Sequence, residues 1–110
     1  MNNVMIVGRL TAGPELIELQ DGRKVSNVLV AVPRSYKNIN GEYETDFIDC
    51  VLWGGVAGNV CEYCQKGDMI GVRGRLATEY YESEDNKTHK KTNVIAEKIT
   101  FISSKHATEN

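Results

Sequence analysis

Two large aromatic side chains lie in the stretch ETDFIDCVLW, residues 44–53, where a β-strand would place them on the same face. Because successive side chains of a strand point to opposite faces, Phe47, Asp49 and Trp53 lie together, and the residues between them form an apolar face for the core. A carboxylate between the two rings favours an open face. Flat rings on an open face form a platform for flat ligands such as the bases of single-stranded nucleic acid. Burial of both rings in the core is the alternative.

A second extended stretch, residues 69–81, combines an aromatic ring with positive charge. Arg73, Arg75 and Tyr81 share one face of it, opposite an apolar face. Cationic side chains neutralise phosphates while rings stack on bases, so the two kinds of residue together indicate nucleic-acid binding. Solvated charges or contacts between subunits are the alternatives for the two arginines. Tyr80 points away from Tyr81, and we expect Tyr80 to be packed. The lysines beside the following hairpin loop are interpreted as solvated: Lys87, Lys90 and Lys91.

Composition limits the class of protein. The chain has 110 residues, enough for one domain with a core, and a formal net charge of -2. A strongly basic chain would by itself indicate nucleic-acid binding, so here any phosphate-binding role depends on where the positive charges lie. No apolar run approaches the ~20 residues that span a bilayer, and the N-terminus lacks the regions of a secretory signal. We therefore expect a cytoplasmic protein with no membrane partner.

Turn signals and apolar periodicity predict five main strands, with one short helix between the third and the fourth. The predicted strands are residues 3–10, 25–32, 44–53, 69–81 and 89–102. This order is that of an OB-fold, an all-β, five-stranded Greek-key barrel that commonly binds oligonucleotides or oligosaccharides. We therefore expect an OB-fold domain over residues 1–103, followed by a polar C-terminal tail over residues 104–110.

Local signals set the boundaries of these predicted elements. Pro33 cannot donate a hydrogen bond to a strand ladder, so it is predicted to end the second strand. Gly67 is suited to cap the C-terminus of the helix. The apolar stripe of that helix is predicted to be Val56, Val60, Tyr63 and Cys64.

Five short motifs follow one another in a specific order and spacing. They are Val7-Gly8-Arg9-Leu10-Thr11, Pro14-Glu15-Leu16, Asp46-Phe47-Ile48, Gln65-Lys66-Gly67-Asp68 and Gly74-Arg75-Leu76. Over roughly residues 1–105 this arrangement resembles the bacterial single-stranded DNA-binding protein family. The resemblance implies an OB-fold that coats exposed DNA strands during replication, recombination and repair. It also implies a homotetramer; a dimer is the alternative, as in the related primosomal replication protein that shares the fold.

The resemblance also assigns roles to individual residues. It gives base stacking to four aromatic side chains: Tyr36, Phe47, Trp53 and Tyr81. It gives contacts with the DNA backbone to Arg9, Arg34 and Lys66, with Lys37 and Lys24 as weaker matches. The predicted DNA-binding set consists of these four aromatic residues and six cations: Arg9, Arg34, Lys37, Lys66, Arg73 and Arg75.

The chain departs from the family pattern in ways that make the predicted groove less positive. Thr78-Glu79 precedes the aromatic residues of the fourth strand, where family members often carry arginine or lysine, and Asp49 lies between two stacking rings. Long members of the family end in a short acidic tip that recruits replication and repair enzymes. This chain stops at Asn110 without such a tip, so we expect a naturally short form or a trimmed version, with no recruitment through an acidic tail.

The cysteines and glycines do not predict a metal site or catalysis. A structural zinc ion needs four ligands, and Cys50, Cys61 and Cys64 would require His89 or His106, neither of which is at a diagnostic spacing. No phosphate-cradling glycine motif or nucleophile elbow occurs. We therefore expect no metal, no cofactor and no enzymatic activity. The alternatives to DNA binding are an OB-fold protein-interaction or primosome-type module with weak or no binding to single strands, and an RNA-binding protein.

Overall fold

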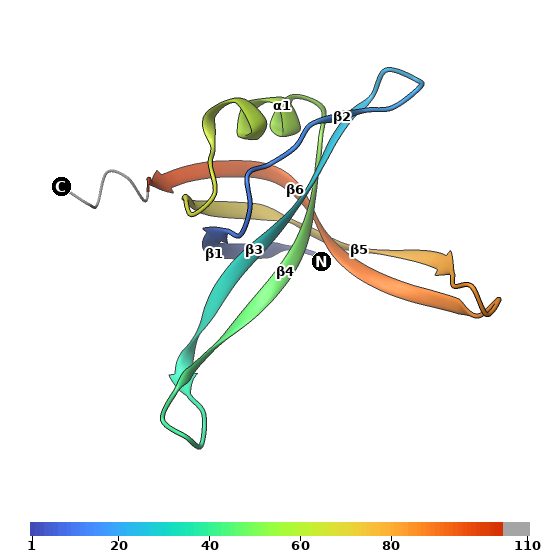
Figure 1. Cartoon of the computed structure of the whole chain (residues 1–110). Coiled ribbons are helices and arrows are strands. Elements are labelled where there is room, and N and C mark those ends of the chain that lie inside the picture. Colours follow the sequence, from blue (N-terminus) through green and yellow to red (C-terminus); the bar gives the residue numbers. More distant parts are fainter. Residues whose placement is uncertain (105–110) are drawn as a thin grey trace.

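The computed structural model describes residues 1–104, which form a twisted β-sheet with one short helix (Figure 1). Its elements in chain order are β1 (Val4–Leu10), β2 (Ile17–Glu18), β3 (Lys24–Lys37), β4 (Tyr43–Trp53), α1 (Gly54–Tyr63), β5 (Met69–Glu82) and β6 (Thr88–Ser103). The predicted tail beyond residue 104 lies outside the described residues, so the proposed domain boundary stays a prediction.

Five of these strands close into a barrel. Neighbouring strands pair in the order β1, β5, β6, β4 and β3, and β3 returns to β1 through Arg9–Ala31 and Leu10–Val30. Only β4 and β6 run parallel among these described pairs. The short β2 adds to the free side of β3. The predicted OB-fold is therefore confirmed, with α1 between the third and fourth of the five main strands.

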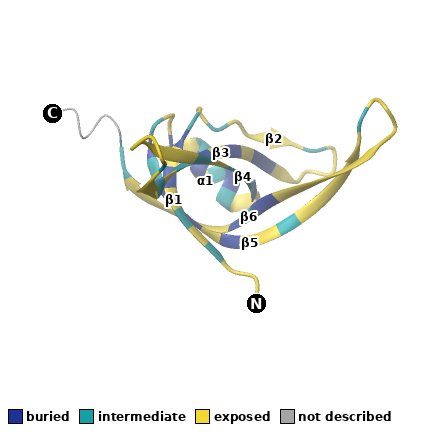
Figure 2. Ribbon diagram, turned by 90° about the horizontal axis from the view of Figure 1, so that it is seen from below, coloured by how far each residue is buried: buried dark blue, intermediate teal, exposed yellow. Residues whose placement is uncertain are grey.

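The core occupies the inside of the barrel, and alternation along each strand selects its residues. Figure 2 shows the buried residues gathered in the barrel and the exposed ones along the hairpins that leave it. The largest fully buried side chains are Leu52, Ile70, Val30, Val72, Cys50 and Ser26. The helix α1 packs against β3, β4 and β6 and adds Ala57 and Val60 to this core. No helix in residues 1–104 is long and apolar enough to cross a membrane.

The β3–β4 hairpin and the β5–β6 hairpin extend beyond the barrel as arms that point in different directions (Figure 1). One arm consists of the distal parts of β3 and β4, and the other of the distal parts of β5 and β6. The prediction that Pro33 ends its strand is wrong, because β3 continues to Lys37. Beyond Ala31 this strand pairs with β4 alone, and its register shifts between Pro33 and Lys37. A proline is tolerated there because a strand with a partner on one side only does not need every N–H group.

The end of the helix also differs from the prediction. α1 ends at Tyr63, with Cys64 as its C-terminal cap, so Gly67 is not the cap. Gly67 instead has a φ of 90° in a turn in which the Asp68 N–H donates to the Gln65 carbonyl, 3.1 Å away. Tyr63, predicted to belong to the apolar stripe, is exposed. The buried positions of this segment are Ala57, Val60 and Cys64.

Candidate nucleic-acid interface

Phe47 lies on the outside of the barrel in the middle of β4. Its side chain is 59% exposed, whereas Cys50 and Leu52, on the opposite face of the strand, are fully buried. The predicted division of β4 into an open face and a core face is therefore confirmed, and a core position for Phe47 is excluded. Its part in binding stays a prediction.

Strand pairing gives Phe47 specific neighbours. Phe47 pairs with Ala31 of β3, and Ala31 pairs in turn with Arg9 of β1, so the three side chains project from one face across three adjacent strands. A hollow of about 350 Å³ borders this row and is lined by Arg9, Ala31, Pro33 and Thr45, among others. The Arg9 side chain donates a hydrogen bond from Nη1 to the Gly67 carbonyl, 2.8 Å away, which fixes its direction. Gly67 lies just before β5, which borders β1 on the side opposite β3, so this hydrogen bond directs the guanidinium away from Phe47.

Trp53 ends β4 and is 38% exposed, which places it at the surface with part of its ring covered. The guanidinium carbon of Arg23 lies 5.1 Å from the ring centroid, a cation–π contact. Arg23 is itself held by Asp21, which accepts from its Nε at 2.7 Å. The sequence analysis did not predict a role for Arg23. Arg23 lies two residues before Val25, which pairs with Trp53, so the register of β3 against β4 brings Arg23 to the ring, and no local pattern in the sequence indicates this contact.

The other two predicted stacking residues lie on the two arms. Tyr36 is exposed on the β3–β4 arm, and Tyr81 is exposed on the β5–β6 arm, where its ring stacks on His89 with centroids 5.4 Å apart. The two arms that carry these residues point in different directions (Figure 1). Tyr80 is also exposed, so the expectation that it is packed is wrong. The lysine on the β3–β4 arm, Lys37, lies over the ring of Tyr43, 5.6 Å from its centroid.

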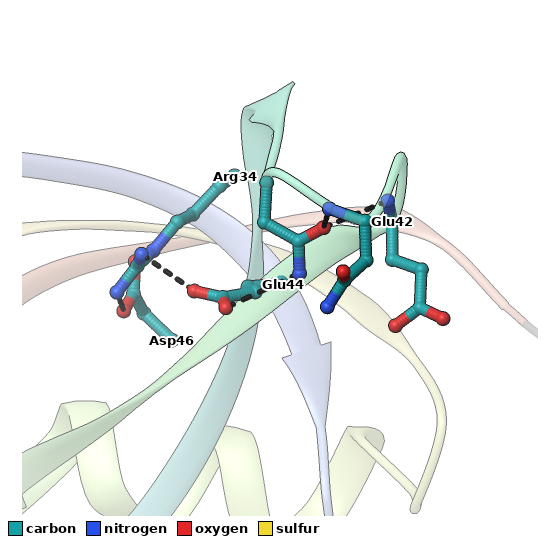
Figure 3. Close-up of polar contacts among 6 residues, drawn as sticks. Arg34, Glu42, Glu44 and Asp46 are labelled. Carbon is teal, nitrogen blue, oxygen red and sulfur yellow. Dashed lines mark hydrogen bonds and ion pairs between the residues drawn. The ribbon is translucent and has the colours of Figure 1, made fainter.

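Arg34 is bound by two carboxylates (Figure 3). Its Nε and Nη2 donate to the two oxygens of Asp46 at 3.1 and 2.9 Å, and its Nη1 donates to Glu44 at 2.8 Å. The hydrogen bonds with Arg34 lower the pKa of Asp46, and those with Asp46 raise the pKa of Arg34. The guanidinium is therefore already paired with anions of the same chain and is not a free cation for phosphate.

The remaining predicted cations occupy different parts of the surface. Lys66 is exposed next to the turn at Gly67. Arg75 of β5 pairs with Ile95 of β6, and Ile95 pairs with Val51 of β4. Arg75 therefore lies on the face of the sheet that carries Phe47. Arg73, two residues earlier on β5, pairs with Met5 of β1 and with Lys98 of β6.

One lysine interpreted as solvated makes a contact across strands. The Nζ atom of Lys91, on β6, lies 3.7 Å from the Asp49 carboxylate of β4. Lys91 therefore belongs to the surface between Phe47 and Trp53. No local pattern in the sequence indicates this contact, because β4 and β6 are far apart along the chain.

The cysteines take part in packing. Cys50 and Cys64 are buried and free, and burial raises the pKa of the Cys50 thiol to about 11. In the part of the chain that the structure describes, no group of three or more histidine, cysteine or acidic residues is arranged to hold a metal ion. The candidate ligand His106 lies outside that part.

Comparison with known proteins agrees with this geometry. A sequence model of the single-strand binding protein family matches residues 1–102. The chain is 44% identical over 104 residues to single-stranded DNA-binding protein B of Bacillus subtilis, covering 94% of this chain and 92% of that protein. It is 45% identical over 105 residues to single-stranded DNA-binding protein 3 of Listeria innocua, covering 96% of this chain and 66% of that protein.

The match to a third relative has similar extent. The chain is 42% identical over 105 residues to the single-stranded DNA-binding protein of Oceanobacillus iheyensis, covering 96% of this chain and 65% of that protein. The chain thus spans nearly all of the Bacillus relative and just under two thirds of the other two. The match extends over every strand of the barrel and over the surface that carries Phe47 and Trp53. The chain belongs to the single-strand binding protein family.

Proposed function

We propose that this protein binds single-stranded DNA without sequence preference and protects it during replication, recombination and repair. The observation that carries the proposal is the exposed ring of Phe47, in register with Arg9 and beside an open hollow, on the barrel of a chain that belongs to this family. The role is binding rather than catalysis. The three free cysteines favour a location in the cytosol, where thiols stay reduced.

The proposed mechanism combines stacking with charge neutralisation. Every base has a π-face, so rings bind any sequence, and each stacked base contributes ~1–3 kcal/mol on alanine substitution. Phe47 and Trp53 are separated by a strand length of about 20 Å, so they contact different nucleotides. Arg9, Lys66 and Arg75 supply positive charge for phosphates. Duplex DNA is excluded because its bases are already stacked on one another.

The fluorescence of Trp53, the only tryptophan of the chain, tests this function directly. Titration with oligo-dT should quench the emission, and duplex DNA of the same length should not. Phe47→Ala keeps the reporter and should weaken binding by about 5- to 150-fold, the value of one stack. Tyr63→Ala removes an exposed ring from α1 and serves as the matched control.

The outcomes separate the proposal from its alternatives. Unchanged affinity in folded Phe47→Ala, or an equal loss in Tyr63→Ala, would contradict the stacking platform. Absence of quenching together with capture of a protein partner would favour an OB-fold interaction module. That alternative is favoured by the carboxylates that occupy Arg34. Competition between oligo-dT and oligo-U measures the preference for DNA over RNA.

We also propose that the chain assembles with itself through β1, as a homotetramer or, alternatively, a dimer. Residues 4–8 of this strand pair with β5 on one side, while pairing with β3 begins only at Arg9. Met5 is 81% exposed and Val7 is also exposed on the outer face of the same segment. An apolar strand with a free edge is a site for pairing with another chain. Pairing with β1 of a second copy supplies hydrogen-bond partners for this free edge and covers its apolar face.

A further inference from the structure

The ion pairs within residues 1–104 are concentrated around the candidate interface. Asp21 pairs with Arg23, which covers Trp53, and Asp49 pairs with Lys91 between Phe47 and Trp53. Glu44 and Asp46 pair with Arg34 on the β3–β4 arm. The distances of these pairs are 2.7 Å for Arg23–Asp21, 3.7 Å for Lys91–Asp49, 2.8 Å for Arg34–Glu44 and 2.9 Å for Arg34–Asp46. The surface that would receive phosphates therefore already contains anions bound to its own cations.

The pairs of Arg34 are the most complete of the set. Asp46 accepts two hydrogen bonds from the guanidinium, and Glu44 accepts a third (Figure 3). A phosphate group is recognised by the same fork of N–H donors, so a phosphate and Asp46 compete for the same atoms. Asp46 directly precedes Phe47 in β4, so its side chain points to the opposite face of the strand, and the competition acts on the β3–β4 arm, where Tyr36 lies two residues after Arg34.

The pairs are accessible enough to exchange. The side chains of Arg34, Glu44 and Asp46 are 37%, 51% and 45% exposed, so water and ions reach all three. Exposed ion pairs contribute little to stability, and a phosphate that arrives on a strand held by neighbouring stacks has a high local concentration. Displacement of Asp46 by phosphate therefore requires no unfolding, only rotation of the side chains.

We propose that Asp46 and Glu44 are built-in competitors of the DNA backbone, which limit affinity by holding Arg34 until a phosphate displaces them and by recapturing it when the strand leaves. This inference rests on the proposed function and names two residues that act against binding. Arg34 exchanges one anion for another, so its contact with DNA releases few counterions. The affinity for single strands should therefore depend only weakly on salt concentration.

Neutralising one competitor tests the inference. In Asp46→Asn, Arg34 becomes available to phosphate. Affinity for oligo-dT at low ionic strength should rise by at least about threefold, mainly through slower dissociation. The slope of log affinity against log salt should become steeper by about 0.7, the value of one phosphate contact on a single strand. The measurements are Trp53 quenching at several salt concentrations and stopped-flow dissociation. Glu44 accepts only one hydrogen bond from Arg34, so Glu44→Gln, which neutralises this weaker partner, should show a smaller change of the same sign.

A matched control separates local competition from net charge. Glu97→Gln changes the total charge in the same direction as Glu44→Gln, but Glu97 lies on β6 at the hollow that faces α1. It should leave both affinity and slope as in the wild type. The double variant Arg34→Ala with Asp46→Asn should lose the gain of Asp46→Asn. Thermal unfolding confirms that each variant is folded.

The outcomes distinguish failure of the competitor role from failure of the proposed function. Equal or weaker binding by folded Asp46→Asn, an equal gain in Glu97→Gln, or a gain that persists without Arg34 overturns the competitor role while leaving the proposed function intact. Absence of oligo-dT binding by the wild type and every variant overturns the proposed function, and the competitor role with it.

Discussion

At the scale of single residues, the candidate interface combines features that oppose each other. The ring of Phe47 is open to solvent, while Arg9, in register with it two strands away, is held by the Gly67 carbonyl. Asp46 and Asp49, which flank this ring in sequence, are bound to Arg34 and Lys91. Stacking is independent of these ion pairs, whereas phosphate binding competes with them. The rings are therefore expected to carry a larger share of binding than the cations.

The Asp46–Arg34 pair predicts a pH dependence of stability. Hydrogen bonds from Arg34 lower the pKa of Asp46 in the folded state. The pair therefore stabilises the fold above the ordinary aspartate pKa of about 4, and this stabilisation is lost as the pH falls through the lower folded value. Asp46→Asn has no such titration, so its melting temperature should fall less than that of the wild type between neutral and acidic pH.

Thermal unfolding of both proteins over a series of pH values checks this expectation. Asp21 and Asp85, whose pKa values are also lowered, titrate in both proteins, so the difference between the two curves reports Asp46. Parallel curves for the two proteins would contradict a stabilising role of the charged pair.

At the scale of elements, two glycines allow the strands of the barrel to approach one another. A Cβ atom on Gly8 would overlap with the Ala31 carbonyl where β1 meets β3, and one on Gly74 would overlap with the Ile95 carbonyl between β5 and β6. The register of β5 and β6 shifts next to Gly74. A strand bends at such an irregularity, which helps a sheet to close. Barrel closure thus depends on close backbone contacts at these positions.

Gly74→Ala should therefore destabilise the barrel. The added methyl group meets backbone that cannot move independently of the sheet, and overpacking of this kind costs about 1–3 kcal/mol or more. Gly71→Ala is the matched control on the same strand, because its nearest contact would be a side-chain atom of Ile102 at 3.6 Å. Urea unfolding gives both free energies. Equal stability of the two variants would show that closure does not depend on Gly74.

At the scale of the whole molecule, the barrel leaves one strand incompletely paired. The segment of β1 before Arg9 has β5 as its partner but no strand on its other side within the described chain. The same segment exposes Met5 and Val7, while Arg73 lies beside Met5 on β5. Val7 also lines the hollow formed with Arg9, Ala31 and Pro33, so the proposed interface between copies borders the candidate DNA surface.

Met5→Lys should weaken self-association, because it places a charge in the apolar contact and repels the same residue of a two-fold related copy. Sedimentation equilibrium should show a smaller assembly for this variant than for the wild type. Ile17→Lys introduces the same side chain at another exposed apolar position, on β2, and should leave the assembly unchanged. A monomeric wild type, or an unchanged mass for Met5→Lys, would refute assembly through β1.

The sequence by itself determined the order of the main strands, the place of the helix and the division of β4 into an open and a buried face. These properties follow from the alternation of side chains and from turn residues, both of which act over a few neighbouring positions. For this reason the pattern of residues 44–53 alone predicts an open position for Phe47 and a core position for Cys50. The family resemblance extended these expectations to the whole barrel.

Only the tertiary structure decided which charges meet, where β3 and α1 end, and how the arms diverge. Strand register brings Arg23 over Trp53, Lys91 to Asp49, and Arg34 to Asp46. Pro33 lies within a strand because β4 alone pairs with that part of β3. Each of these features depends on which segments become neighbours, and that is set by closure of the barrel as a whole rather than by any local pattern.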